Sequence, residues 1–254
     1  MSAIYWFSGT GNSLYAAKFL AGALGDMPLV PVAAGAAPGE VGGAGEKIGF
    51  VFPSYYGNLP RSVRAFVDQL VIKQGTYLFA VVTMGAFGQG AIAALETALA
   101  AKGLRLHYGR GIRMPANYIM MYNPASTEKS AGKLTTVNRK LSARAREIAA
   151  GAQRIKKINF TAQTLYKNIE ALDRAFCADA ACTSCGLCAR LCPVGNIRLQ
   201  GGKPNWQGRC EHCAACISWC PAKAIQYGNQ TQKRRRYHNP AIQAEELARA
   251  KAAQ

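Results

Sequence analysis

The chain lacks any run of about eighteen consecutive apolar residues, the length that a membrane-spanning helix needs. Its first residues carry neither the basic segment nor the small-residue cleavage site of an export signal. We therefore expect a cytoplasmic protein without a membrane span. Because thiols stay reduced in the cytoplasm, we do not expect disulfides among the nine cysteines.

Acidic residues are scarce. Asp and Glu number 13 against 31 Lys and Arg, which gives a formal net charge of +18. The basic residues are spread along the chain, with one dense run, KRRR, at residues 233–236. This charge favours an acidic partner, nucleic acid or an anionic membrane, although a solvated basic surface without a specific ligand would give the same composition.

The dinucleotide fingerprint G-x-G-x-x-G is also missing. Gly9 and Gly11 are followed at position 14 by Leu instead of the third glycine. The sequence therefore does not support a dedicated NAD(P) domain. It shows no pattern of a general acid, a nucleophile or a catalytic metal triad, so no catalytic residue is predicted and enzymatic activity stays an open question.

The N-terminal residues combine an apolar run with a loop of small polar residues. Residues 4–7 read IYWF, the loop SGTGNS follows, and apolar residues at helical spacing come next, which predicts strand, tight loop and helix. Backbone N–H groups and the dipole at a helix N-terminus favour an anion, and Gly9 and Gly11 would let the backbone approach it. A capped helix start would give the same pattern. The polar side chains that can bind a phosphate are Ser8, Thr10, Asn12 and Ser13.

Strands and helices are predicted to alternate over the first 112 residues. Apolar runs predict further strands at residues 29–32, 47–52, 77–83 and 104–112, and helical spacing predicts helices at residues 60–70 and 88–102. This alternation predicts an α/β fold with a parallel sheet covered on both faces. Such sheets bind ligands beyond the carboxyl ends of their strands, where the strand order reverses.

Three loops are expected at that edge of the sheet. SGTGNS follows the first strand, PSYYGNLP (residues 53–60) the third, and TMGAFGQG (residues 83–90) the fourth. Together they predict a cofactor site formed by Ser8, Gly9, Thr10, Gly11, Asn12, Ser13, Pro53, Ser54, Tyr55, Tyr56, Gly57, Asn58, Thr83, Met84, Gly85, Ala86, Phe87, Gly88 and Gly90.

In this order the three loops resemble those of flavodoxins. The resemblance implies a doubly wound, five-stranded parallel sheet that binds FMN, with the 5′-phosphate in the SGTGNS loop. It implies that Tyr55, or its rival Tyr56, lies against the isoalloxazine ring, and that residues 83–90 bind the pyrimidine edge. Phe87 would cover the other side of the ring or fill the core. Where flavodoxins have a helix between strands two and three, residues 33–46 are rich in Gly and Pro, which predicts a surface loop.

The middle of the chain predicts two helical segments. Residues 113–126 predict a connection, and residues 127–150 an amphipathic helix that Gly151 would end. This helix would close a first domain at residues 1–155. A second helical stretch near residues 160–175 would lie in a linker, residues 156–176.

Eight of the nine cysteines lie between residues 182 and 220, in two copies of one pattern. CTSCGLCARLCP begins at Cys182 and CEHCAACISWCP begins at Cys210, both of the form C-x-x-C-x-x-C-x-x-x-C-P. Ile197 and Ile225 follow at the same offset. Only Cys177 lies outside the pattern.

The repeated pattern predicts two [4Fe–4S] clusters. Three thiolates at two-residue gaps bind one cluster, while the fourth, redirected by the following proline, binds the other. The predicted ligand sets are Cys182, Cys185, Cys188 and Cys220 for one cluster, and Cys210, Cys213, Cys216 and Cys192 for the other. Tetrahedral Zn²⁺ is the alternative, but it would leave the third cysteine and the Cys-Pro of each block without a role.

Residues 177–228 resemble bacterial two-cluster ferredoxins, which implies a small α+β domain. Residues 229–254 would form a basic tail with a short helix. No pattern requires Cys177, Trp206 or any of the three histidines, and His212 is expected to be a surface imidazole. Trp219 is expected to fill core space.

The whole arrangement resembles a family of flavodoxin-ferredoxin fusions, and the likeness spans residues 1–228. It implies an electron-transfer protein in which FMN and the two clusters pass low-potential electrons to or from a redox partner, expected to be an acidic protein. Exposed clusters of this kind would suit an anaerobe. Two alternatives remain: a flavin-dependent reductase of a quinone, nitro compound or metal chelate, and a nucleic-acid-binding iron-sulfur protein suggested by the basic charge.

Overall fold

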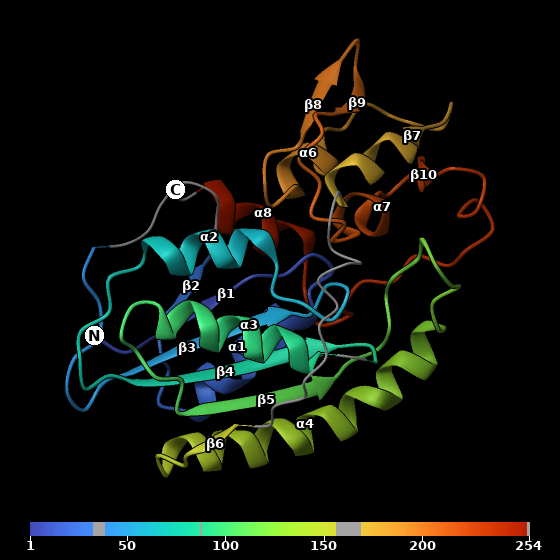
Figure 1. Cartoon of the computed structure of the whole chain (residues 1–254). Coiled ribbons are helices and arrows are strands. Elements are labelled where there is room, and N and C mark those ends of the chain that lie inside the picture. The colour runs from blue at the N-terminus through green and yellow to red at the C-terminus, as the bar shows by residue number, and fades with distance from the viewer. Residues whose placement is uncertain (33–38, 87, 156–168, 253–254) are drawn as a thin grey trace.

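A six-stranded parallel sheet forms the N-terminal half of the chain (Figure 1). The computed structural model describes residues 1–32, 39–86, 88–155 and 169–252. The strands follow the spatial order β2-β1-β3-β4-β5-β6, which is the doubly wound, flavodoxin-like order with one strand added. They are β1 (Ala3–Trp6), β2 (Leu29–Pro31), β3 (Lys47–Pro53), β4 (Tyr77–Met84), β5 (Tyr108–Arg113) and β6 (Arg154–Ile155).

The predicted count of five strands is wrong by one. β6 pairs in parallel with β5 through Tyr108 and Arg154 and through Gly109 and Ile155. This two-residue strand forms because the chain leaving the preceding helix runs along the free edge of β5. It covers part of an edge that would otherwise present unpaired backbone groups.

The central strands are apolar throughout because both of their faces are buried. β3 and β4 read KIGFVFP and YLFAVVTM, and the interior residues of both are buried, as expected for a sheet covered on two sides. The one glycine inside β3 makes room for an aromatic ring, since a Cβ on Gly49 would lie 2.2 Å from Cζ of Phe79.

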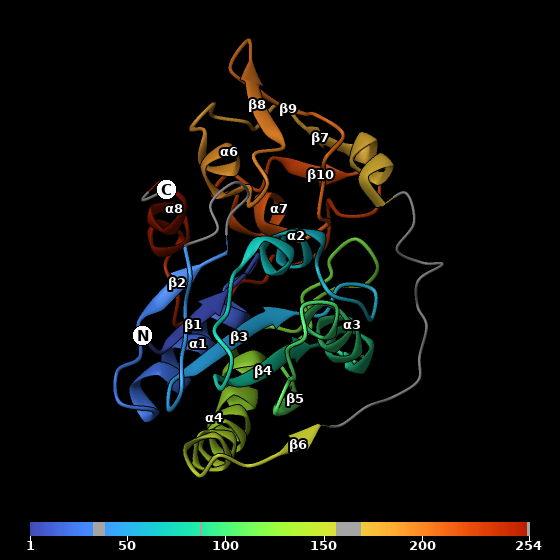
Figure 2. The ribbon, with the colours of Figure 1, turned by 60° about the vertical axis from the view of Figure 1, so that its left-hand side comes forward.

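Helices cover both faces of the sheet (Figure 2). α1 (Asn12–Ala23) and α4 (Thr127–Ala149) bury their apolar sides in one core, and α2 (Arg61–Gln69) and α3 (Gln89–Ala100) bury theirs in the other. The sequence predicted a helix after the SGTGNS loop without bounds, and it predicted the bounds of α2, α3 and α4 within two residues. β5 begins at Tyr108 instead of residue 104, because Leu104 and Leu106 enter the core before strand pairing starts.

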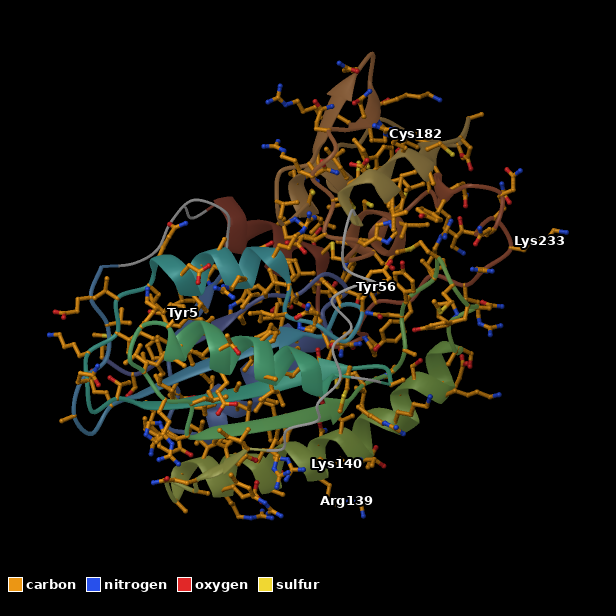
Figure 3. The ribbon with its side chains drawn as sticks, viewed as in Figure 1. Tyr5, Tyr56, Arg139, Lys140, Cys182 and Lys233 are labelled. Carbon is orange, nitrogen blue, oxygen red and sulfur yellow. The ribbon has the colours of Figure 1, made fainter. Side chains whose placement is uncertain are left out.

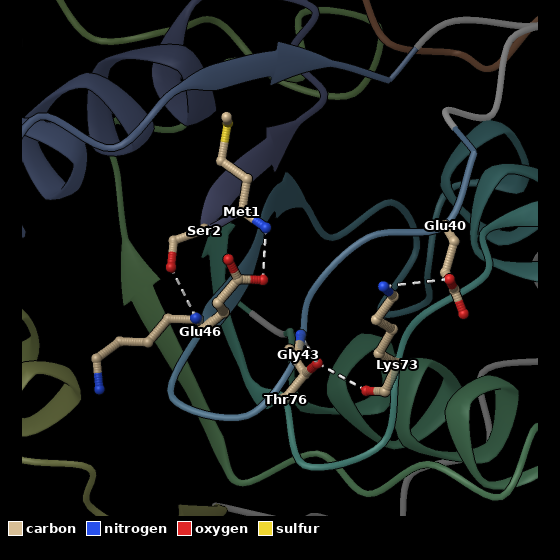
Figure 4. A network of polar contacts seen from close by, with 8 residues as sticks. Met1, Ser2, Glu40, Gly43, Glu46, Lys73 and Thr76 are labelled. Carbon is tan, nitrogen blue, oxygen red and sulfur yellow. Dashed lines mark hydrogen bonds and ion pairs between the residues drawn. The ribbon is translucent and has the colours of Figure 1, made fainter.

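The Gly-rich segment between β2 and β3 contains no helix over residues 39–46, as predicted, while residues 33–38 lie outside the described residues. Polar contacts hold this loop (Figure 4): Gly43 N donates to Thr76 Oγ1 at 2.8 Å, Thr76 Oγ1 donates to Lys73 O at 2.7 Å, and Lys73 pairs with Glu40 at 3.3 Å. These residues lie where the parallel strands begin, so the loop is remote from the predicted cofactor loops.

The cysteine-rich half, residues 169–228, contains short elements only. They are η1 (Ile169–Ala175), a 3-10 helix, followed by β7 (Phe176–Ala178), α6 (Leu187–Leu191), β8 (Ile197–Gln200), β9 (Lys203–Trp206), α7 (Ala215–Trp219) and β10 (Ile225–Tyr227). β10 pairs with β7 and β8 with β9, both antiparallel. The linker helix predicted near residues 160–175 is described only from residue 169, where the chain is 3-10 helical; residues 156–168 lie outside the described residues.

The internal repeat predicted from the cysteine pattern is present in the backbone. α6 recurs as α7 and β8 as β10, each 28 residues later. The strand pairing follows the same shift. Ile197 pairs with Trp206 and Ala178 with Ile225, and Ala178 and Ile197 lie 28 residues before Trp206 and Ile225 respectively. Left-handed residues recur at the same offset too, in the pairs Ser184 and His212, Gly186 and Ala214, and Gly195 and Lys223.

The two halves of the chain meet through a buried carboxylate. Glu211, inside the second cysteine block, accepts hydrogen bonds from Ser62 N at 2.7 Å and Ser62 Oγ at 2.6 Å. Ser62 lies in the first turn of α2, where backbone N–H groups have no partner within the helix. Beside it, Arg61 donates to the carbonyl of Cys210. The cysteine-rich half thereby supplies the cap of a helix in the other half.

The tail, residues 229–252, crosses back to the sheet and ends in α8 (Ala244–Ala252), close to the predicted short helix. Leu247 of α8 is buried in the core shared with α1, and Glu246 pairs with Lys18 of α1. Within the described part of the chain, no helix combines the length and the apolar character that crossing a membrane requires.

We predict that Glu211→Ala lowers the free energy of unfolding by about 1–3 kcal/mol, because it leaves the buried N–H and hydroxyl of Ser62 without their acceptor. Glu245→Ala, an exposed position at the start of α8, is the matched control and should change it by less than about 0.5 kcal/mol. Urea denaturation of both variants measures the difference. Equal effects would show that the Glu211 contact does not join the halves.

Candidate functional site

The SGTGNS loop joins β1 to α1 at the carboxyl edge of the sheet. Gly11 has φ of +91° directly before the helix, and its N–H donates to Ser8 Oγ at 3.1 Å. Among the described residues, no protein group accepts a hydrogen bond from the N–H of Thr10, Asn12 or Ser13. The loop therefore offers several backbone donors at the N-terminus of a twelve-residue helix, the arrangement that binds phosphate groups.

The side chains of this loop bind neighbouring protein segments. Ser13 Oγ lies 2.7 Å from Thr83 Oγ1, and Asn117 donates to the hydroxyl of Thr10. Asn12 Nδ2 donates to Pro115 O at 3.1 Å. Asn12 was predicted to bind phosphate through its amide; in the structure that amide fixes the connection after β5 to the loop, a role that the sequence did not reveal.

The loop after β3 makes a tight turn. Tyr55 N donates to Asn58 O at 3.1 Å and Asn58 N to Tyr55 O at 2.8 Å. Tyr56 and Gly57, at the tip, both have positive φ, 51° and 80°, as in a two-residue type I′ turn. The turn therefore directs its two tyrosine side chains differently.

The two tyrosines have different surroundings. The Tyr55 ring packs edge-on against Phe7 with centroids 6.2 Å apart, and its hydroxyl lies near Gly9. Tyr56 contacts the cysteine-rich half, where its hydroxyl lies 3.0 Å from His212 Nδ1 and also meets the hydroxyl of Tyr118 (Figure 3). Of the two rivals, Tyr55 is the one placed beside the SGTGNS loop.

The loop after β4 is partly described. Thr83 is buried, Gly85 and Ala86 are exposed, and Phe87 lies outside the described residues. Met84 packs so closely that a Cβ on Gly88 would lie 2.6 Å from its sulfur. Ser54 N donates to Thr83 O at 2.8 Å, while the Ser54 hydroxyl is buried with no hydrogen-bond partner among the described residues. A buried polar group without a partner at this edge fits a site whose ligand supplies one.

The expectation for His212 is wrong. This side chain is 2% exposed, with Phe176 and Tyr227 rings at 5.7 and 5.4 Å and Tyr118 OH at 2.8 Å from Nδ1. Burial lowers its pKa to about 4, so the ring is neutral at neutral pH. Ser184 of the first block and His212 of the second have the same left-handed backbone conformation. Ser184 is exposed, whereas His212 is buried by its neighbours.

Each predicted ligand set of four cysteines lines one hollow. Cys182, Cys185, Cys188 and Cys220 line one hollow together with Leu187, Leu199 and Pro221. Cys192, Cys210, Cys213 and Cys216 line a second hollow with Phe176, Ile197 and Trp206. The fourth cysteine of each block thus crosses to the hollow of the other block.

These hollows do not have the geometry of a site for one ion. In the ranges that the structure describes, no three His, Cys, Asp or Glu side chains converge as the ligands of a single metal ion would. The four cysteines of each hollow therefore surround it without converging on one point. Two further donors point at sulfur: Asn196 N donates to Cys192 Sγ and His212 N to Cys210 Sγ, both at 3.2 Å.

Burial disfavours the thiolate form of several of these cysteines. It raises the pKa of Cys188 to about 11 and that of Cys210 to about 12, and it raises the pKa of Cys216 strongly as well. Neighbouring thiolates add to the rise in each case. These cysteines are therefore protonated thiols at neutral pH unless a positive charge such as a metal centre is bound beside them.

The second hollow adjoins the SGTGNS loop. A Cβ on Gly9 would lie 2.4 Å from the carbonyl oxygen of Cys213 and 2.9 Å from its Cβ. Trp219 is the last residue of α7 and lies between the predicted ligands Cys216 and Cys220. Its Nε1 donates to Gly9 O at 3.0 Å. Trp219 therefore does more than fill core space, because it links the two halves at this loop.

The basic run KRRR has a structural role that the sequence did not reveal. Arg234 donates to Ile119 O at 2.7 Å, Arg235 to Pro124 O at 2.8 Å, and Arg236 to Ile225 O at 2.9 Å. Three of its four residues therefore bind backbone carbonyls, two in the connection between β5 and α4 and one in β10. They hold the tail against both halves of the chain.

Beyond the run, the tail covers the SGTGNS loop. Tyr237 OH and Asn239 Nδ2 donate to Asn12 Oδ1 at 2.8 and 3.1 Å, and Asn239 N donates to Thr10 O at 2.8 Å. His238 stacks on Trp219 with ring centroids 4.0 Å apart. The loop is thus enclosed by the cysteine-rich half on one side and by the tail on another.

Comparisons with known proteins find a match only among solved structures. A scan against protein-family models finds no match, and no curated protein matches. Among solved structures, one that matches is a crystal structure of a Bacteroides uniformis protein named provisionally as a flavoprotein. The two are 19% identical, the match covers 53% of this chain and 97% of that chain, and the TM-score is 0.34. A likeness this distant identifies neither a family nor a function.

We predict that Gly9→Ala lowers the free energy of unfolding by about 1–3 kcal/mol, because the new methyl group collides with the backbone of Cys213. Gly132→Ala is the matched control: this glycine is exposed in α4, and an added Cβ meets nothing within 4 Å. It should raise stability by about 0.5–1 kcal/mol. Thermal and urea denaturation of the two variants would test this; a harmless Gly9→Ala contradicts the close approach.

Proposed function

We propose that the chain is an electron-transfer protein that binds FMN at the carboxyl edge of its sheet and two [4Fe–4S] clusters in its two cysteine-lined hollows. The contact of Gly9 with Cys213 is the observation on which the proposal depends. It brings the loop suited to a flavin phosphate against the backbone of a candidate cluster ligand. Neither half would be expected to make this contact if the two acted independently.

The flavin part of the proposal is supported by the donors and the ring at the sheet edge. The N–H groups of Thr10, Asn12 and Ser13 are available to a phosphate. Tyr55 lies beside that loop, and the next loop holds the hydroxyl of Ser54, which has no hydrogen-bond partner in the part of the chain that the structure describes. A planar heteroaromatic ring needs such a combination of an aromatic face and directed donors.

The iron-sulfur part is supported by the division of eight cysteines between two hollows. Tetrahedral Zn²⁺ holds its thiolates at about 2.3 Å from one point, whereas among the described residues no three such side chains converge on one point. The crossing of Cys192 and Cys220 matches the ligand exchange of two-cluster ferredoxins. The ninth cysteine, Cys177, lines neither hollow.

When bound, FMN supplies one- and two-electron redox chemistry and the clusters supply one-electron transfer. The residues of the chain set the order in which the three sites lie. Cys185 of the first hollow is exposed, Cys210 and Cys216 of the second are buried, and Cys213 of the second touches the SGTGNS loop. The first hollow is therefore the outer site, and the second lies between it and the flavin loops.

The nucleic-acid alternative rests on the net charge of +18, and the densest basic part of that charge has a structural role. Its densest basic segment, residues 233–236, is used to bind carbonyl groups through Arg234, Arg235 and Arg236. Guanidinium groups committed in this way are poorly placed to bind phosphates of a nucleic acid. Electron transfer explains the cysteines and the loops together.

We predict that protein purified without oxygen contains about eight iron and eight sulfide per chain, as two [4Fe–4S] clusters require, and one FMN. Metal analysis, sulfide assay and flavin extraction on one sample measure all three. Stoichiometric zinc in place of iron would contradict the cluster proposal. Full iron without flavin would contradict the flavin proposal alone.

We predict that Cys185→Ala and Cys216→Ala each lower the iron content to about four per chain, since each removes one ligand of a different cluster. Cys177→Ala is the matched control and should retain all iron. Photoreduction followed by absorbance and electron paramagnetic resonance would measure cluster content and flavin reduction in each variant. A loss of iron in the Cys177 variant equal to that in the others would contradict the ligand sets.

A further inference from the structure

The mouth of the first hollow carries an exposed apolar patch. Cys185 is exposed there, Leu199 lines the hollow and is 42% exposed, and Pro221 lines it and is exposed. A Cβ on Gly186 would lie 3.5 Å from Leu199, so the side chain of Leu199 lies over the cysteine loop. Because Cys185 is the one exposed residue among the eight candidate cluster ligands, this mouth is where an outside molecule can come closest to them.

Basic side chains surround this patch, and we call Arg190, Lys203 and Lys223 the basic rim. Arg190 Nη1 donates to Cys185 O at 3.0 Å, and Lys203 Nζ donates to Asp179 O at 3.2 Å, just before the first cysteine block. Lys223 follows Cys220 and donates from its N–H to the Cys220 carbonyl at 3.0 Å. All three residues are exposed.

Acidic groups do little to offset this charge. Between residues 172 and 236, Asp173 and Glu211 are buried and bind internal N–H donors. Asp179 is exposed, but its carboxylate accepts from Ala181 N and Gln226 Nε2. The exposed basic residues in the same stretch are Arg174, Arg190, Arg198, Lys203, Arg209, Lys223, Lys233 and Arg235.

We infer that the patch and its basic rim are the docking site of an acidic one-electron carrier protein. The inference rests on the proposed function. In each encounter the carrier is oxidised by one electron and the centre in the first hollow is reduced by that electron, with no bond formed or broken. A small apolar centre ringed by charge suits brief docking that is fast and salt-sensitive.

The chemistry of the patch favours a protein over nucleic acid. Proteins that bind single strands stack bases on exposed aromatic rings, and none of the residues of the patch or the basic rim is aromatic. Trp206, which lines the second hollow, stacks on Phe176 with ring planes 13° apart and so is engaged within the protein. Exposed Leu and Pro with a charged rim match the composition of a small protein interface.

The test uses the reconstituted full chain and, as the probe, an acidic plant-type [2Fe–2S] ferredoxin, reduced and mixed without oxygen. The second-order rate of flavin reduction should fall about tenfold or more between about 0.01 M and 0.15 M ionic strength, because screening removes the attraction. Lys203→Glu/Lys223→Glu should slow the reaction at least tenfold at low salt.

Arg139→Glu/Lys140→Glu is the matched control, with the same change in net charge. Figure 3 shows these two side chains on α4, far from Cys182 in the same view. The control should change the rate less than twofold. Equal slowing in both double variants would overturn the docking site, because it would make the effect one of net charge alone.

Two further measurements separate this inference from the proposed function. Dithionite should reduce the flavin in all variants; failure in the unaltered protein would overturn the proposed function itself. The docking inference alone would be overturned if dithionite reduces the flavin normally but the rate of flavin reduction by ferredoxin changes neither with salt nor in Lys203→Glu/Lys223→Glu. Mixed-sequence oligonucleotides should not compete with ferredoxin for the surface, and competition lost in Lys203→Glu/Lys223→Glu would assign the surface to nucleic acid instead.

Discussion

The arrangement of the whole protein depends on one close approach between two backbones. Gly9 has no side chain, and the carbonyl of Cys213 occupies the space that a Cβ would take. Any other residue at this position would push the cysteine-rich half away from the sheet. Two hydrogen bonds stabilise the same approach. Glu211 accepts from Ser62 N at the start of α2, and Trp219 donates to the carbonyl of Gly9. The loop at the end of β1 is thus both a candidate phosphate site and the joint between the halves.

The tail shows how a charged segment can have a structural role. Arg234 and Arg235 donate to carbonyls of the connection between β5 and α4, and Arg236 donates to a carbonyl of β10. Loops around a sheet edge leave many carbonyl oxygens without strand partners, and guanidinium groups satisfy them from a distance that shorter side chains do not reach. The net charge of +18 is therefore in part a consequence of how this fold is held together.

Sequence reasoning succeeded where local rules decide the outcome. The strand, loop and helix at the N-terminus, the four helices on the sheet and the repeated cysteine loops follow from hydrophobic period, glycine and spacing. It failed where a residue depends on a segment distant in the chain. His212 and Ser184 occupy equivalent turns, and contacts with residues distant in the chain, Tyr56 and Tyr118 among them, bury the first. No local pattern indicates that Glu211 caps α2 or that Asn12 binds the connection after β5. β6 is too short for any pattern to reveal it.

The contact between the tail and the SGTGNS loop has a consequence for biosynthesis. Tyr237 and Asn12 are separated by 225 positions, yet their side chains share a hydrogen bond. The ribosome therefore releases the N-terminal loop long before the residues that enclose it exist. While the chain is being made, the nascent loop lacks its covering strap, and the enclosure is completed only after residue 239 has emerged. The SGTGNS loop therefore reaches its final enclosure only after the tail, which is distant in sequence but adjacent in space, has been translated.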